Sequence, residues 1–221
     1  MEDMVDRITL VYNKTLTDNF IGTYLIQKSR MKNSSNIFFS RKWDIESSEN
    51  NKMRRSVFDH YRDLCTGYEW NKEDNVSIIP VCHGTDLAIA EKICETGFAS
   101  LSSLDQGWYG KGIYFSSYSL YCSPYIMSRR QPSIIFGWLL PGNTYPVTES
   151  HNSDDTLIGS ALKAGYQSHY IAVDKKGHVN PDDDERYNEI VVGQESQIVP
   201  AAILHINPDK MSQITSQWIK E

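Results

Sequence analysis

The chain has 221 residues, of which 40% are hydrophobic and 23% charged, and this length suits one large domain with a substantial core. Its formal net charge of −6 at pH 7 provides no uniform basic field for phosphates, so general nucleic-acid binding is disfavoured. We expect a single domain over residues 1–221, with an N-terminal helix-and-strand portion over residues 1–75 and a core over residues 76–207.

The N-terminal portion is expected to contain two helices and one strand. Apolar residues recur at helical spacing over residues 11–28 and again over residues 56–64. Residues 36–45, between these helices, are predicted to form a strand. The polar stretch 46–55 is too short to indicate a domain linker.

The clearest predicted helix follows a short apolar run. Residues 77–82 are typical of a buried strand, and His83, Gly84 and Thr85 come directly after them. Thr85 is the expected N-cap of the next helix, and Gly97 is expected to end it. The expected apolar face of that helix consists of Ile89, Ala90, Ile93 and Cys94.

The second half of the chain is expected to be rich in strands. Two glycines precede a predicted strand at residues 113–115, and residues 118–130 are predicted to form a helix kinked at Pro124. Further strands are predicted at residues 133–140, 145–148, 169–173, 189–192 and 202–206. Helices that come early, rather than strictly between the strands, favour an α+β domain over a doubly wound one.

The cysteines and the N-terminus bear on metal binding and compartment. Acidic residues near the N-terminus do not fit a signal peptide, and no run approaches about 18 apolar residues, so we expect a cytoplasmic protein without a membrane partner. The four cysteines form no CxxC pair, so neither a zinc site nor a disulfide scaffold is expected. They are Cys65, Cys82, Cys94 and Cys122.

His83 and Gly84 are candidate ligand-binding residues because of their position between a predicted strand and a predicted helix. The imidazole of His83 can project into the crevice there, although a histidine that only bonds a neighbouring carbonyl would fit the same pattern. Gly84 leaves the backbone open to an amide group, although an ordinary turn glycine would look the same. Cys82 is disfavoured as a nucleophile paired with His83, because adjacent strand side chains point to opposite faces.

Tyr114 and Glu189 are the other candidates. A tyrosine on a strand can lay its ring on a planar ligand, although simple packing is the commoner role. Glu189 begins an otherwise apolar strand, so its carboxylate needs a partner or a function that offsets desolvation. The remaining acids singled out are expected in solvent: Glu46, Glu149, Glu195 and the cluster at residues 182–185.

Four segments occur in a specific order: HGT after a strand, a helix ending in GF, YGKGIYF, and NEIVVxxxxQxxP. Together they resemble the catalytic domain of the poly(ADP-ribose) polymerase-like, diphtheria-toxin-like ADP-ribosyltransferases. The resemblance implies an ADP-ribosyltransferase-like fold, with a split mixed or antiparallel sheet core and flanking helices.

This resemblance also implies NAD⁺ as co-substrate and no metal. The family's His-Tyr-Glu triad falls on His83, Tyr114 and Glu189, and Thr85 joins the NAD⁺ site as the last residue of HGT. His83 would bond the nicotinamide-side ribose, the backbone of Gly84 would hold the carboxamide, and Tyr114 with Tyr125 would sandwich the ring. Cys122 stands where the family usually has a serine; the alternative alignment uses Ser119 with Tyr121, or Ser123.

The expected reaction moves ADP-ribose from NAD⁺ to a macromolecular acceptor, a protein, with mono-transfer favoured. Glu189 would stabilise the oxocarbenium-like charge that develops on the ribose. Because Tyr187 stands two residues before Glu189, the ExE or QxE pattern of arginine-directed transferases is missing. Three alternatives stay open: an NAD⁺ glycohydrolase, an inactive NAD⁺ or ADP-ribose binding module, and a tRNA 2′-phosphotransferase, although the arginines that the last needs are absent near HGT and YGKGIYF.

Overall fold

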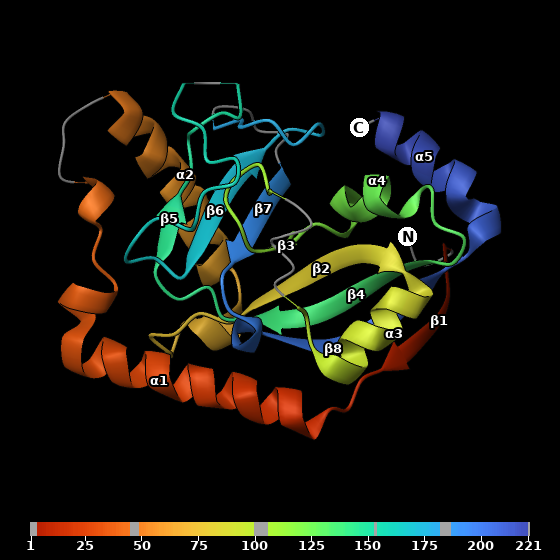
Figure 1. Cartoon of the computed structure of the whole chain (residues 1–221), viewed down its shortest axis with the longest axis horizontal. Coiled ribbons are helices and arrows are strands. Elements are labelled where there is room, and N and C mark those ends of the chain that lie inside the picture. The colour runs from red at the N-terminus through yellow and green to blue at the C-terminus, as the bar shows by residue number, and fades with distance from the viewer. Residues whose placement is uncertain (1–3, 45–48, 100–105, 153, 182–186, 221) are drawn as a thin grey trace.

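The computed structural model describes residues 4–44, 49–99, 106–152, 154–181 and 187–220 (Figure 1). Within these ranges the chain forms five α-helices and eight β-strands, and the strands make two four-stranded sheets. The predicted α+β class is therefore correct. None of the described helices is both long and apolar enough to span a membrane.

The first sheet is antiparallel and includes both an early and a late strand of the chain. Its order is β1 (Val5–Leu10), β8 (Ile198–Ile206), β4 (Pro132–Leu139) and β2 (Ile79–Asp86). The sequence did not predict β1, because the polar pair Asp6-Arg7 interrupts the alternation of apolar and polar residues in this short strand. Five of its six residues are exposed. Backbone pairing with β8 is what defines this strand.

The second sheet consists of β3 (Ile113–Phe115), β7 (Tyr187–Val192), β6 (Ser168–Val173) and β5 (Thr144–Pro146), in that order. Only the β5–β6 pair, among the described strands, is parallel. All six residues of β6 are buried, as expected for a strand covered on both faces. The predicted strands at residues 113–115, 169–173 and 189–192 are confirmed.

The helices cover the two sheets from different sides (Figure 1). They are α1 (Lys14–Phe38), α2 (Glu49–Thr66), α3 (Leu87–Thr96), α4 (Ser123–Ile126) and α5 (Met211–Lys220). Helix α1 contacts β8, α2 contacts β5 and β6, and α3 contacts β4 and β8. One hydrophobic cluster contains buried residues from both sheets and from α2 and α3, so the main core lies between the sheets.

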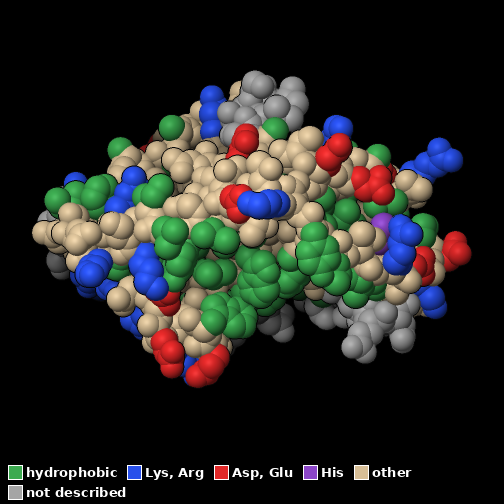
Figure 2. Space-filling model, turned by 90° about the horizontal axis from the view of Figure 1, so that it is seen from below, with side chains coloured by type: hydrophobic (Ala, Val, Ile, Leu, Met, Phe, Trp, Pro, Cys, Tyr) green, Lys and Arg blue, Asp and Glu red, His purple; other side chains and the backbone are tan. Residues whose placement is uncertain are grey.

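Helix α1 presents much of its apolar surface to solvent. Its residues are all described, and the buried ones are Phe20 and Gln27. Ile21, Leu25 and Ile26 stay exposed. Hydrophobic side chains accordingly gather across the face of the molecule that is seen from the side of α1 (Figure 2).

Three local predictions were wrong. Residues 36–45 do not form a strand, because α1 continues to Phe38 and a 3₁₀ turn follows at Lys42–Asp44; Ile45 lies outside the described residues. The kinked helix predicted over residues 118–130 is a 3₁₀ turn (Ser119–Cys122) followed by the short α4, because Pro124 sits in the first turn of α4 and begins that helix. Asp86, not Thr85, caps α3, since its carboxylate accepts a hydrogen bond of 3.2 Å from the Ala88 N–H.

The outcome for α3 is otherwise close to the prediction. Gly97 ends the helix with a φ of 95°, a conformation that favours glycine. Ala90 and Cys94 are buried and Ile93 packs against the core, but Ile89 is exposed. The apolar face is therefore narrower than predicted.

Candidate functional site

A small cavity of about 60 Å³ is lined by residues from both sheets and from the segment that follows β3. Its lining residues come from segments far apart in the chain: Cys82, His83, Gly84, Tyr114, Phe115, Ser116, Tyr121, Cys122, Tyr125 and Glu189. Six of the residues predicted from the sequence are thus brought together. Thr85, the seventh, is buried and is not among the lining residues.

The two sheets are joined by backbone hydrogen bonds beside this cavity. The Cys82 N–H donates to Ser116 O at 2.8 Å, and the Ser116 N–H donates to Cys82 O at 3.2 Å. His83 therefore lies within a paired strand and not after its end, because β2 continues to Asp86. Cys82 packs with Cys122 and Ile126, whereas the His83 ring packs on aromatic rings of the main core, so these neighbours do face opposite sides.

His83 is oriented by a hydrogen bond to the backbone of β3. Its Nδ1 lies 3.0 Å from Tyr114 O, and a carbonyl oxygen only accepts, so Nδ1 carries the hydrogen. Burial lowers the pKa of His83, so the ring is neutral at pH 7. Its Nε2 is then a hydrogen-bond acceptor, suited to a ligand hydroxyl.

Gly84 lies where β2 approaches the segment at residues 122–126 most closely. A Cβ atom at this position would lie 2.9 Å from Cys122 O and 3.0 Å from Ile126 Cγ2. Strand β2 is an edge strand of its sheet. Alternate residues of a strand direct their N–H and C=O groups to the same side, so the backbone groups of Gly84 face the same open edge as those of Cys82. Gly84 is therefore a strand glycine with backbone groups at the cavity edge.

Two tyrosines of the cavity differ in exposure. The Tyr114 hydroxyl accepts from the Tyr109 N–H at 2.9 Å and donates to Gly110 O at 2.7 Å, so its ring is fixed. Tyr125 is 51% exposed and stands at the rim. A fixed inner ring and an accessible outer ring are suited to a flat ligand.

Cys122 is a buried thiol between β2 and the rim. Its hydrogen bond with Cys82, together with burial, raises the pKa of Cys122 well above its ordinary value. The thiol therefore stays protonated at neutral pH and is a weak hydrogen-bond partner.

Glu189 is the acid of the cavity and is only 7% exposed. Burial raises the pKa of Glu189 to about 7, although a hydrogen bond from Tyr121 opposes that rise. The Tyr121 hydroxyl donates to Glu189 Oε1 at 2.6 Å. Sequence reasoning gave Tyr121 only an alternative alignment role, and the one available signal was that a buried carboxylate needs a partner.

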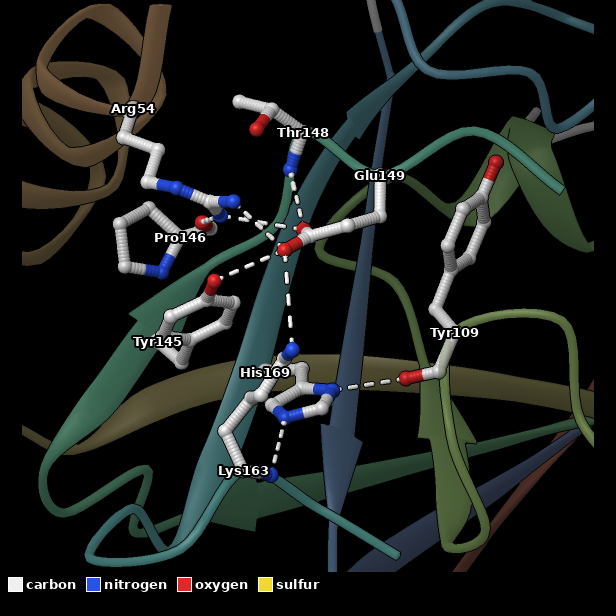
Figure 3. A network of polar contacts seen from close by, with 8 residues as sticks. All are labelled: Arg54, Tyr109, Tyr145, Pro146, Thr148, Glu149, Lys163 and His169. Atoms are coloured by element: carbon white, nitrogen blue, oxygen red, sulfur yellow. Dashed lines mark hydrogen bonds and ion pairs between the residues drawn. The ribbon is translucent and has the colours of Figure 1, made fainter. Parts of the chain in front are cut away.

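A second buried acid, Glu149, was wrongly expected on the surface (Figure 3). Arg54 binds both of its carboxylate oxygens, at 2.5 and 3.0 Å, and the Tyr145 hydroxyl donates to Oε1 at 2.8 Å. Burial alone would raise the pKa of Glu149, but the bonds from Arg54 hold it below its ordinary value. This carboxylate is saturated with partners and lines no part of the cavity, so its role is structural.

The remaining acids that were expected in solvent are Glu46, Glu195 and those at residues 182–185. Glu195 is exposed, as predicted. Glu46 and residues 182–185 lie outside the described residues. Among the described side chains, no cluster of three or more His, Cys, Asp or Glu residues could hold a metal ion.

Comparisons with known proteins give no independent identification. No protein-family model matches the chain, and no curated protein matches its sequence. The case for a function therefore depends on the geometry of the cavity and on the ordered sequence motifs.

Proposed function

We propose that this chain is an NAD⁺-dependent ADP-ribosyltransferase with an ADP-ribosyltransferase-like fold, which transfers ADP-ribose to a protein acceptor and releases nicotinamide. The observation that carries the proposal is the convergence of the resembling motifs on one cavity: His83 and Gly84 from HGT, Tyr114 from YGKGIYF, and Glu189 from NEIVV. These segments lie far apart in the chain.

The residues present fit the nicotinamide riboside end of NAD⁺. The backbone of Gly84 offers a C=O at a strand edge, and its N–H, which donates to the weakly accepting Cys122 sulfur, can exchange that partner for a carboxamide oxygen. Tyr114 and Tyr125 offer ring faces for nicotinamide, and His83 Nε2 can accept from a ribose hydroxyl. The cavity volume of about 60 Å³ is below the range of small-molecule pockets, so the ring of Tyr125 at the rim has to move to admit nicotinamide.

Glu189 supplies the charge that this chemistry needs. Breaking the bond between nicotinamide and ribose generates oxocarbenium-like charge on the sugar, and a nearby carboxylate stabilises it. With a pKa of about 7, Glu189 is about half ionised at neutral pH. We therefore expect the rate to rise with pH through this range, since the ionised form is the active one.

The surroundings of Glu189 favour an acceptor side chain other than arginine on the protein acceptor. Tyr187, two residues earlier on β7, packs against Tyr121 and Trp218 with ring centroids 5.4 Å away in each case. An aromatic cluster therefore occupies the position where arginine-directed enzymes carry an acid. Among the described residues, those that line the cavity include no lysine or arginine, which disfavours a phosphotransferase. Mono-transfer stays the favoured outcome by analogy with the family.

The test is to incubate the chain with NAD⁺ labelled in the ADP-ribose moiety in a cell lysate, and to measure nicotinamide, labelled protein and free ADP-ribose. Glu189→Gln keeps the shape of the side chain and removes its charge, so we expect protein labelling to fall by at least about 100-fold. Glu195→Gln, at an exposed glutamate, is the matched control and should label normally.

The alternatives give different products. A glycohydrolase would yield free ADP-ribose without labelled protein. A binding module would retain NAD⁺ and release no nicotinamide. Equal labelling by the wild type and Glu189→Gln would contradict the role given to Glu189.

A further inference from the structure

Tyr121 is the closest partner of Glu189 and is itself buried, at 5% exposure. It lies in the 3₁₀ turn at Ser119–Cys122, and it lines the cavity together with Glu189 of β7. Its hydroxyl reaches Glu189 Oε1 at 2.6 Å across 68 residues of sequence. The bond is a short, charge-assisted type when Glu189 is ionised.

The Tyr121 side chain is confined by its neighbours. Its ring packs against Tyr187 at 5.4 Å and against Trp218 of α5 at 6.1 Å, measured between ring centroids. Gly177 closes the remaining side: a Cβ there would lie 3.1 Å from Tyr121 Oη and 3.6 Å from Glu189 Oε1. The hydroxyl is therefore held in place against the carboxylate.

We propose that Tyr121 is a positioning residue, whose hydroxyl fixes Oε1 of Glu189, favours the ionised carboxylate and leaves Oε2 for the substrate. This inference rests on the proposed function for its effect on turnover. Tyr121 remains a donor throughout the working range, because burial and the nearby Glu189 both raise its pKa far above the ordinary tyrosine value.

Few other groups act on Glu189. The titratable side chains that share the cavity with it are His83, Tyr114, Tyr121, Tyr125, Cys82 and Cys122, and Tyr109 lies close enough to feel its charge. His83 is neutral and the Cys122 thiol is protonated at pH 7. Lys175, from the segment beside Gly177, instead donates to Trp218 O at 2.9 Å. In the described residues, Tyr121 is therefore the group that stabilises the carboxylate.

The test is Tyr121→Phe, which removes one oxygen and keeps the ring packing. We expect the pKa of Glu189 to rise by about 1 to 2 units, the equivalent of one charge-assisted hydrogen bond. Carbon-13 NMR of labelled glutamate measures this pKa directly, and loss of the signal in Glu189→Gln assigns it. In nicotinamide release, the acid limb of the kcat profile should move to higher pH by a similar amount, with KM for NAD⁺ changed less than twofold.

The matched control is Tyr145→Phe, which also removes a phenol bond to a buried carboxylate, at Glu149, away from the cavity. It should leave the titration of Glu189 and the kcat profile unchanged. Incorporation of 3-fluorotyrosine at position 121 provides a variant of opposite sign: its more acidic hydroxyl should lower the pKa of Glu189 without loss of packing.

An unchanged pKa of Glu189 in both Tyr121 variants would overturn the inference. A shifted pKa of Glu189 with no movement of the acid limb of the kcat profile would overturn it as well. The NMR titration also separates this inference from the proposed function. If the wild type releases no nicotinamide at any pH, the transferase proposal fails, and the titration still decides whether Tyr121 controls Glu189.

Discussion

Glu189 makes the folded state more stable when it is protonated than when it is ionised. Burial raises its pKa from 4.5 to about 7, so the folded protein binds this proton more tightly than the unfolded chain between those values. The favourable contribution is fully present below pH 4.5 and is lost as pH rises through 7. The ionised form of Glu189, which is the form proposed for catalysis, therefore makes the folded protein less stable.

Glu189→Gln should therefore stabilise the protein in a pH-dependent way. Glutamine resembles the protonated acid, so we expect the free energy of unfolding to exceed that of the wild type by on the order of 2–3 kcal/mol at pH 8.5, and by clearly less at pH 5. Urea denaturation at the two pH values measures this. An equal gain in the free energy of unfolding for Glu189→Gln at both pH values would contradict the raised pKa.

Several site residues could be predicted from the sequence because their motifs are local. HGT, YGKGIYF and NEIVV identify His83, Tyr114 and Glu189 with neighbours that lie next to them in the chain. Tyr121 and Glu149 could not be assigned, because their partners are 68 and 95 residues away. Local polarity made Glu149 look like a surface residue, and only the fold brings Arg54 to it.

Among the elements, helix α2 is attached to the second sheet by the ion pair between Arg54 and Glu149. Arg54 comes from the N-terminal third of α2 and binds both Glu149 and Pro146 O at the end of β5 (Figure 3). Its side chain is 11% exposed and that of Glu149 is 4% exposed. The next residue, Arg55, makes its ion pair with Asp44 at 52% exposure, so two adjacent arginines differ mainly in burial.

Arg54→Met should destabilise the protein by about 3–5 kcal/mol, because it leaves the Glu149 charge buried with the more distant Lys163 Nζ, at 3.9 Å, as its remaining cation among the described residues. Arg55→Met on the same helix should cost less than about 1 kcal/mol, since its ion pair is exposed. Chemical denaturation compares the two variants. The double variant Arg54→Met, Glu149→Leu should recover much of the loss, and similar losses for both single variants would refute a structural role for the buried pair.

Predictions for elements succeeded where burial gives a periodic pattern. Helices α2 and α3 were found, as were β3, β4, β6 and β7, because each buries a regular set of side chains. Helix α1 was also found, although its buried residues are Phe20 and Gln27. The C-terminal helix α5 was missed although Met211, Ile214 and Trp218 recur at helical spacing. The misassigned residues 36–45 contain apolar side chains that the structure leaves in solvent, such as Ile37 at 64% exposure.

For the whole molecule, the α+β class followed from the order of patterns, but the division into two sheets did not. The pairing of β1 with β8 joins nearly opposite parts of the sequence, and nothing local specifies it. The cavity arises from this division, because β2 comes from one sheet and β3 and β7 come from the other.

A ligand in this cavity should therefore stabilise both sheets together. At 100 times its Kd, NAD⁺ should add about 2.7 kcal/mol to the free energy of unfolding, which raises Tm by several degrees in a chain of this size. Gly84→Ala should lose the shift, because the added methyl group crowds Cys122 and Ile126. In the control Gly22→Ala the added methyl group lies in open space, so the Tm shift caused by NAD⁺ should remain. No shift for the wild type at millimolar NAD⁺ would count against the cavity as its binding site.

The pair of backbone hydrogen bonds between Cys82 and Ser116 limits how the molecule can move. A hinge rotation of one sheet against the other would have to break both bonds beside the cavity. Closure around a ligand by rigid-body movement of the sheets is therefore disfavoured, and adaptation falls to side chains at the rim, of which Tyr125 is half exposed. The amide hydrogens of Cys82 and Ser116 should accordingly exchange with solvent only through global unfolding.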